Sequence, residues 1–272
     1  MSTLAICCAN LVIVVGLAAC IVSLAMEYWV KITVNRANLP ASMQQENNEV
    51  YYSRQRGIFR TCFEDDAAWL NNYKPIGKTI KGNCLMEDIF KLENNSEIVS
   101  LGDKYGQRND LIAVHLAFQC LAILFLLVSF IVGICGCHRY SASTVRITGI
   151  LALLASLFMA GAMTVFHFYE YLEKKLINHG MFYKVWSTLP AMNGNFSYKY
   201  HFAYMLGWIG MALAFITACW YFYLAKAVIR EKRRMKDRQE RYAEERTRNY
   251  DHLVENPAKE YSRWNQRDPY RY

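Results

Sequence analysis

The stretch "RGIFRTCF" at residues 56–63 is a short apolar and aromatic segment inside a polar region. It contains Cys62, and a second cysteine of the same region, Cys84, follows in "KGNCLMED". Apolar, aromatic and β-branched residues in so short a stretch predict a β-strand, here one that begins at Gly57. On both sides the polar region is flanked by long hydrophobic runs, so the strand is expected in a small unit tethered at both ends.

Four runs of the chain contain no Asp, Glu, Lys or Arg, and each is 23 to 26 residues long. About 20 apolar residues in a helix cross the roughly 30 Å hydrocarbon core of a bilayer. The runs therefore predict four transmembrane helices, at residues 4–26, 111–136, 147–169 and 200–225. They divide the chain into a membrane domain (residues 1–225), with long loops at residues 27–110 and 170–199, and a tail (residues 226–272).

The basic residues of the connecting segments predict the orientation, because short cytoplasmic segments are enriched in Lys and Arg. The link between the second and third runs holds Arg139 and Arg146 and no acid. The tail carries 14 basic and 9 acidic residues, whereas the first long loop carries 11 basic and 12 acidic ones. We therefore expect a plasma-membrane protein with both termini in the cytoplasm and both long loops outside.

Two N-x-S/T sequons, at Asn94 and Asn195, fall in the loops that this topology places outside. A sequon in an external loop is an acceptor for N-glycosylation. Both asparagines are therefore predicted glycosylation sites. Asn195 lies only a few residues before the fourth apolar run, which restricts the access of the transferase, so Asn94 is the favoured site.

The cysteines divide according to the same topology. Cys62 and Cys84 are the two of the nine that lie outside, in one loop, where an oxidising environment permits a single intramolecular disulfide. Closing a loop of this length contributes roughly 3 kcal/mol in the chain-entropy model. Cys135 and Cys137 lie at the cytoplasmic end of the second run, a position that favours reversible palmitoylation, with plain packing as the alternative.

Several segments of the two external loops have the composition of short β-strands. Residues 28–35, "YWVKITVN", alternate with a period of two and are rich in β-branched residues. Further strands are predicted at residues 50–55, 57–63 and 81–90 of the first loop and at residues 181–187 of the second. Because strand edges need partners, we expect one sheet shared by both loops. The predicted fold is membrane α+β, a four-helix bundle that carries an extracellular antiparallel sheet.

These features together resemble the claudin superfamily, which includes claudins, peripheral myelin protein and the stargazin-type channel subunits. Its pattern is a Trp after the first helix, then Gly-Leu-Trp, then two cysteines in the first loop. The matching positions here are Trp29, Gly57-Ile58-Phe59, Cys62 and Cys84, with Phe59 in place of the motif's Trp. Arg108 before the second run and "YMLGWIG" at residues 204–210 are also similar to the family. The resemblance covers residues 4–225.

The resemblance implies adhesion or formation of a paracellular barrier at cell–cell junctions. The sheet would then associate with itself or with related claudin-like proteins in the same membrane and across the gap. The resemblance also implies an alternative, an auxiliary subunit that regulates the trafficking or gating of an ion channel or receptor, and the long first loop favours that branch. The expected partners are the lipid bilayer and either a claudin-like protein or a larger channel.

The tail begins with a basic cluster beside the membrane, formed by Arg230, Lys232, Arg233, Arg234 and Lys236. Such clusters attract anionic lipids of the inner leaflet at about 1 kcal/mol per charge. The alternative is an ordinary basic flank that sets the orientation. The terminal "PYRY", with Tyr270 and Tyr272, partly matches the C-terminal ligands of PDZ-domain scaffolds.

The sequence contains no phosphate-binding loop, no H-E-x-x-H and no G-x-S-x-G motif. The "CGCH" at residues 135–138 has poor spacing for a zinc site. We therefore expect a protein that is not an enzyme and that has no catalytic residue, metal or cofactor. The net charge of +8 lies largely in the tail, and nucleic-acid binding is not indicated.

Overall fold

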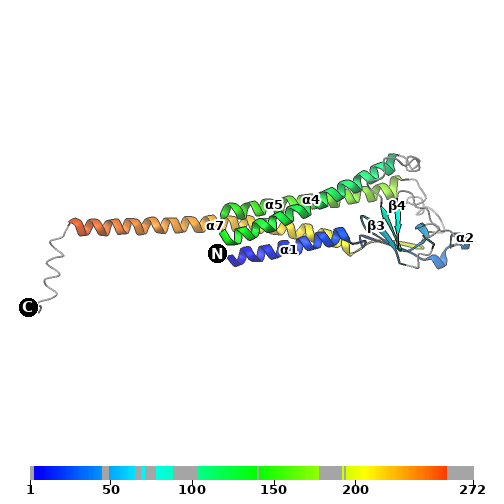
Figure 1. Ribbon diagram of the computed structural model, residues 1–272, viewed down its shortest axis with the longest axis horizontal. Helices are drawn as coiled ribbons and strands as arrows, with labels where there is room; N and C mark the ends of the chain where they lie inside the picture. Colours follow the sequence, from blue (N-terminus) through cyan, green and yellow to red (C-terminus); the bar gives the residue numbers. More distant parts are fainter. Residues whose placement is uncertain are drawn as a thin grey trace, which may run out of the picture.

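A computed structural model of the chain shows four long helices with a six-stranded sheet at one end (Figure 1). It describes residues 3–44, 49–64, 69–70, 78–87, 103–139, 141–177, 192 and 194–255. The long helices are α1 (Thr3–Ala25), α4 (Asp103–Arg139), α5 (Ala142–Tyr171) and α7 (Phe202–Glu255). All four are long and apolar enough to cross a membrane, as predicted. α4, α5 and α7 extend beyond the uncharged runs that indicated them.

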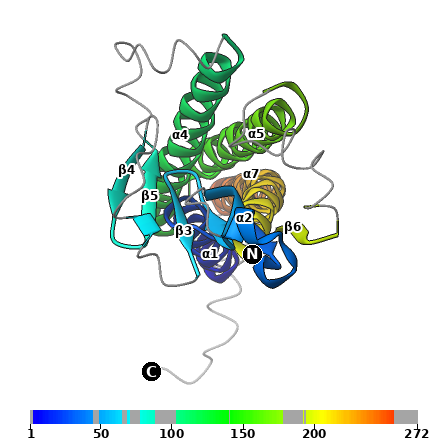
Figure 2. The same ribbon diagram turned by 90° about the vertical axis from the view of Figure 1, so that its right-hand side faces the viewer.

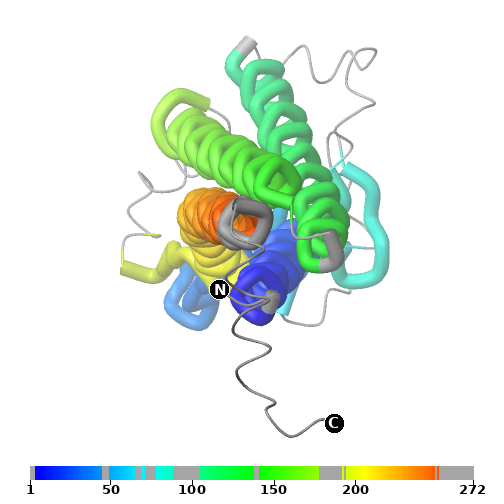
Figure 3. The backbone as a smooth tube through the Cα atoms, turned by 90° about the vertical axis from the view of Figure 1, so that its left-hand side faces the viewer, coloured from blue at the N-terminus to red at the C-terminus, as the bar shows by residue number. Residues whose placement is uncertain are grey.

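The four helices pack as a closed ring, in which α4 contacts α5, α5 contacts α7, α7 contacts α1 and α1 contacts α4. Figure 3 shows this arrangement from the end opposite to the sheet. Small residues permit such close approach of membrane helices. Ala152, Ala155 and Ala162 of α5 are fully buried. A Cβ added to Gly210 of α7 would lie only 2.6 Å from the Cys20 Sγ of α1, so a larger residue there would push these helices apart.

Helix α7 is much longer than the bundle. Its apolar part ends at Ala225, and the helix continues to Glu255 as a straight arm beyond the other three (Figure 1). At 1.5 Å per residue this arm is about 45 Å long. Its side chains are largely exposed, so the arm is stabilised by local helical interactions and not by the bundle.

The sheet is antiparallel and combines strands from both long loops, in the order β4-β5-β3-β2-β1-β6 (Figure 2). Its strands are β1 (Val30–Val34), β2 (Arg54–Arg56), β3 (Arg60–Phe63), β4 (Lys78–Lys81), β5 (Cys84–Glu87) and β6 (Phe196–Tyr200). β6 pairs with β1 along its whole length, from Val30 opposite Tyr200 to Val34 opposite Phe196. The prediction of one sheet shared by both loops is confirmed.

β1 has the alternating pattern expected of a strand with one covered face. Val30, Ile32 and Val34 are buried, whereas Thr33 is exposed. Short helical segments connect β1 to β2: η1 (Arg36–Asn38), α2 (Ala41–Gln44) and η2 (Glu49–Tyr51). After α5 the chain continues into one π-helical segment, η5 (Leu172–Leu176).

Some predicted strands have different bounds in the structure. Residues 57–59, predicted to begin a strand, form a bend between β2 and β3. Residues 81–90 were predicted as one strand, but Lys81 ends β4 and β5 begins only at Cys84. Between them Gly82, with φ of +60°, makes the tight hairpin turn that a glycine favours. Residues 88–90 of this prediction lie outside the described residues.

Two further strand predictions have other outcomes. Within residues 50–55, Val50 and Tyr51 belong to the helical turn η2, and the strand begins only at Arg54. The segment 181–187 lies outside the described residues. The strand that the structure places in the second loop is β6, and for this reason α7 begins at Phe202 and not at residue 200.

Candidate functional site

The sheet is closed covalently near its outer edge. Cys62 of β3 and Cys84 of β5 lie directly opposite each other and form a disulfide, as predicted. β5 also carries the hairpin partner β4, which is the edge strand. The bond therefore fixes the β4–β5 hairpin, at one edge of the sheet, to β3.

We expect Cys84→Ser to destabilise the protein by about 3 kcal/mol, because the reduced loop regains the chain entropy that the disulfide removes. Surface delivery of the variant should fall accordingly, and cell-surface biotinylation measures it. Cys120→Ser is the matched control, since Cys120 is a free, exposed cysteine of α4. Normal surface delivery of the Cys84 variant with a protease-resistant loop would contradict this role of the disulfide.

Gly57 lies where the bend between β2 and β3 meets the end of α1. A Cβ on Gly57 would be 2.7 Å from the Cα of Glu27 and 2.8 Å from the carbonyl oxygen of Met26. The bend is closed by the Gly57 amide, which donates to the Arg60 carbonyl at 2.8 Å. The next residue, Ile58, is buried, and Phe59 packs partly buried against the same core. Glycine is required here because two backbone segments touch.

Trp29 fills the space between the sheet and the four helices, and its side chain is fully buried. Its indole Nε1 donates to the Ser23 carbonyl of α1 at 2.6 Å. Its ring packs against Phe166 of α5 with centroids 4.9 Å apart, and edge-on against His115 of α4 at 5.3 Å and Tyr204 of α7 at 6.3 Å. One side chain thus contacts all four helices directly beneath β1.

Eight charged residues lie together between the sheet, the first turns of α4 and the last turns of α5 with η5. We call this set the buried charge cluster; its members are Glu49, Arg56, Lys78, Glu87, Arg108, Glu170, Glu173 and Lys174. Their side chains are 3 to 24% exposed. The four acids and four bases balance, as burial of charge requires, because an unpaired buried charge is very costly.

Arg108 of α4 is the centre of the buried charge cluster. Its Nε donates to Glu173 Oε1 of η5 at 2.6 Å. Its two terminal nitrogens donate to the two carboxylate oxygens of Glu87 in β5, at 3.2 and 3.3 Å. This forked arrangement uses the planar guanidinium, which matches a carboxylate with two parallel hydrogen bonds. Arg108 therefore ties the disulfide-bonded strand β5 to α4 and η5.

Arg56 makes the second connection. It forms ion pairs with both Glu170 of α5 and Glu173 of η5. Glu170 also accepts a hydrogen bond from the Tyr198 hydroxyl of β6 and pairs with Lys174 at 3.2 Å. Strands of the first and second loops are thus fixed to the same carboxylate, that of Glu170. The π-helical segment places Glu173 beside both arginines, in keeping with the frequent use of such segments at functional positions.

Lys78 and Glu87 complete the buried charge cluster on the side of the hairpin. The Lys78 Nζ lies 3.1 Å from Glu49 and 3.9 Å from Glu87. Burial alone would raise the pKa of Glu87, but the charges of Arg108 and Lys78 outweigh it and lower this pKa from 4.5 to about 2. Burial alone would lower the pKa of Lys78, but Glu49 and Glu87 raise it above its ordinary value of 10.5.

These pKa directions predict the pH range in which the sheet stays attached. The contribution of Glu87 is present above 4.5, its ordinary pKa, and is lost as the pH falls toward 2. The contribution of Lys78 is present below 10.5 and is lost only as the pH rises through its elevated pKa. We therefore expect the melting temperature to be insensitive to these two groups between roughly pH 5 and 9. Below pH 4.5 the melting temperature should fall, because Glu87 becomes protonated. Glu87→Gln should weaken the acid-induced fall; an unaltered fall would contradict the assignment.

The other predicted site residues lie away from this cluster. Asn94 is outside the described residues, as are Tyr270 and Tyr272. Asn195 is half-buried beside β6, and its Oδ1 accepts a hydrogen bond from Asn38 at 3.4 Å. Its glycosylation stays a prediction.

The predicted palmitoylation sites differ in environment. Cys135 is exposed, whereas the half-buried Cys137 has its Sγ 3.3 Å from the Cys7 Sγ of α1 and 3.4 Å from the Asn10 amide nitrogen. Of the two, Cys135 is therefore the more accessible to an acyltransferase. The predicted basic cluster lies on the arm of α7, and all five of its residues are exposed; its members are Arg230, Lys232, Arg233, Arg234 and Lys236.

Of the buried charge cluster, sequence reasoning identified only Arg108, through the family resemblance. Glu170 and Glu173 follow an apolar run at a spacing of three, so a helix places them on one face, and this is a usable signal. Glu87 and Arg56 have no such signal, because their partners come from distant segments. In the part of the chain that the structure describes, no group of three or more His, Cys, Asp or Glu residues is arranged to hold a metal ion.

Comparison with known proteins relates this arrangement to one family. Residues 14–223 match the model of the family described as "PMP-22/EMP/MP20/Claudin tight junction". A comparison with curated proteins finds no match. The matched range includes about half of α1, the whole sheet and every member of the buried charge cluster, and it ends within α7 just before the arm.

Proposed function

Because the chain belongs to the PMP-22/EMP/MP20/claudin family of multi-pass membrane proteins, we propose that it acts at cell–cell contacts, in adhesion or barrier formation. The sheet is the surface that meets a second molecule of this or a related protein. Both long loops would then be extracellular, and both termini would be cytoplasmic. This orientation is supported by the basic link between α4 and α5 and by the basic tail.

The attachment of the sheet to the bundle is the observation that supports this proposal most. The buried charge cluster fixes the sheet to α4, α5 and η5. Strands from both loops form that sheet, and one disulfide joins two of its strands. The outward face of the sheet is consequently held at a defined orientation to the membrane before any partner arrives. A binding surface that is already ordered loses less entropy on association, which favours weak contacts repeated many times between two membranes.

The outward face near β1 and β6 is polar. Lys31 and Lys199 are paired positions on neighbouring strands, and Lys31 forms an ion pair at 2.6 Å with Glu64, the residue after β3. Like charges opposite each other are unfavourable within a sheet. Lys199→Glu should therefore preserve the fold while it reverses the charge that this face presents.

The test is a mixed culture of cells that express the tagged protein and cells that do not. We expect enrichment at borders between two expressing cells and a higher transepithelial resistance in the pure expressing culture. Lys199→Glu should reduce the border enrichment, whereas Lys236→Glu in the arm, with the same charge change, should not. Even distribution over the surface, at all borders alike, would contradict a role at contacts.

The arm of α7 supports a second candidate function. A charged helix about 45 Å long on the tail side can reach a large membrane partner from within the cell. This arrangement suits an auxiliary subunit of an ion channel or receptor. Affinity purification in mild detergent followed by mass spectrometry distinguishes the two functions. Stoichiometric recovery of a channel supports a role as an auxiliary subunit. Recovery of claudin-like proteins or junction scaffolds, including those with PDZ domains, supports a role at cell–cell contacts.

A further inference from the structure

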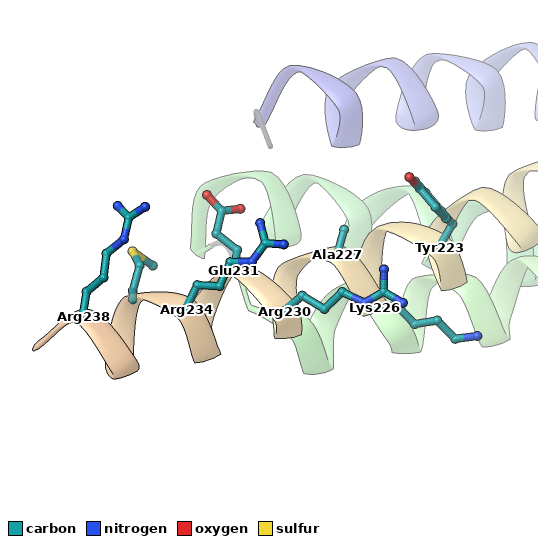
Figure 4. Close-up of a pocket in the computed structure, with 8 residues that line it drawn as sticks. Tyr223, Lys226, Ala227, Arg230, Glu231, Arg234 and Arg238 are labelled. Atoms are coloured by element: carbon teal, nitrogen blue, oxygen red, sulfur yellow. The ribbon is translucent and has the colours of Figure 1, made fainter. Parts of the chain in front are cut away.

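The arm of α7 carries a row of cations along one face. Lys226, Arg230, Arg234 and Arg238 recur every fourth residue, so they lie on the same side of the helix. Figure 4 shows them in succession along α7, with Tyr223 at the end nearer the bundle. Together with Tyr223, Ala227, Glu231 and Met235, they line a hollow of about 480 Å³. We call this row the cationic face.

The cationic face carries four positive charges, and one acid, Glu231, lines the same hollow. Lys236 forms an ion pair with Glu240 at 3.5 Å on another side of the helix. Like charges four residues apart destabilise a helix, and the cationic face contains three such pairs in a row. A bound polyanion would remove this repulsion, whereas monovalent salt only screens it.

The position along α7 indicates which polyanion is within reach. The apolar part, residues 202–225, is about 36 Å long, so it crosses a hydrocarbon core of roughly 30 Å and leaves Lys226 at the headgroups. Arg230 and Arg234 follow about 6 and 12 Å further out. The headgroup layer is only about 5–8 Å thick on each side, so a single phosphodiester reaches Lys226 and Arg230 but not Arg234. A headgroup that stands up from the bilayer and carries further phosphates reaches all three.

We propose that the cationic face binds the headgroup of a polyphosphorylated inositol lipid. Lys226 and Arg230 contact the phosphates nearer the bilayer, and Arg234 contacts the outermost one through the paired N–H groups that arginine offers to phosphate. Tyr223, which is 61% exposed, lies at the membrane boundary beside the acyl chains. The proposal rests on the cytoplasmic orientation of the tail, and it narrows the predicted basic cluster to one face of the helix.

The test uses the full-length protein in detergent, titrated with a short-chain phosphatidylinositol bisphosphate and followed by native mass spectrometry. Arg230→Ala/Arg234→Ala should weaken binding about 30-fold, at about tenfold per 1.4 kcal/mol and about 1 kcal/mol per charge. The control is Lys232→Ala/Lys236→Ala, which removes the same charge from the opposite face, because each lies about 200° around the helix from the arginine two positions earlier. The affinity of this control variant for the lipid should stay within about threefold of that of the wild type.

Three outcomes would overturn the proposal. An equal loss in both double variants means that the arm acts only as a basic flank. Equal binding of phosphatidylserine at the same total charge means that several phosphates on one headgroup are not needed. Equal binding of free inositol trisphosphate and of the lipid means that the ligand is soluble and not a membrane component. Border enrichment in the mixed culture does not depend on any of these, so failure here is distinguishable from failure of the proposed function.

Discussion

Arg108→Ala is expected to destabilise the protein by about 3–5 kcal/mol, because it leaves the carboxylates of Glu87 and Glu173 buried without their principal partner. The variant should lose the attachment of β5 to α4 and should be retained inside the cell. Unfolding by added denaturing detergent, followed through tryptophan fluorescence, measures the loss of stability. Surface biotinylation measures the retention.

Two variants make the test of Arg108 specific. Arg60→Ala breaks the ion pair with Glu27, but Arg60 is 41% exposed, so we expect a loss of no more than about 1 kcal/mol. Arg108→Lys keeps the charge and loses the forked contact with Glu87, so its stability should lie between the wild type and the alanine variant. If Arg108→Ala were as mild as Arg60→Ala, the buried charge cluster would not be what holds the sheet to the helices.

Trp29→Ala is the second large effect that we expect, also a loss of about 3–5 kcal/mol, because it opens a cavity in contact with all four helices. Trp29→Phe should cost less, since it keeps most of the ring volume and loses the hydrogen bond to Ser23. The same unfolding assay applies.

Trp208→Ala is the control for Trp29→Ala. Trp208 of α7 is 39% exposed, so its replacement by alanine leaves a smaller cavity. Equal losses at the two tryptophans would show that Trp29 serves as an interfacial anchor of the kind common at membrane boundaries. The structure places it instead beneath β1, in the middle of the contact between the two parts of the fold.

The parts of the fold that could be predicted depend on local pattern. Each helix follows from an uncharged run, and β1 from its alternation of apolar and polar residues. Pairing of Cys62 with Cys84 followed from topology, since the other cysteines were predicted within the membrane or on its inner side. The predicted start of β3 at Gly57 was wrong, because residues 57–59 form a bend. At this bend Gly57 touches the backbone of residues 26 and 27, and a contact so distant in sequence leaves no local pattern.

The buried charge cluster could not be predicted in the same way. Sequence patterns predict the burial of apolar side chains. Nothing in the sequence distinguishes Glu87, Glu170 and Glu173 from solvent-exposed glutamates in loops and at helix ends. Their burial is possible only because Arg56 and Arg108 arrive from other elements. Such a site depends on tertiary pairing. The resemblance to the family indicated only Arg108, and the spacing of Glu170 and Glu173 indicates only that they share a helix face.

The central claim is that both long loops form one sheet, in which β6 of the second loop pairs with β1 of the first. Thr33 and Ser197 are paired positions in this register. In the double variant Thr33→Cys/Ser197→Cys we predict a second disulfide in addition to Cys62–Cys84. Mass spectrometry of peptides prepared under non-reducing conditions detects it. Thr33→Cys/Tyr198→Cys, shifted by one residue so that the second side chain points to the other face of the sheet, should give none. Equal cross-linking in both double variants, or none in the first, would contradict the shared sheet.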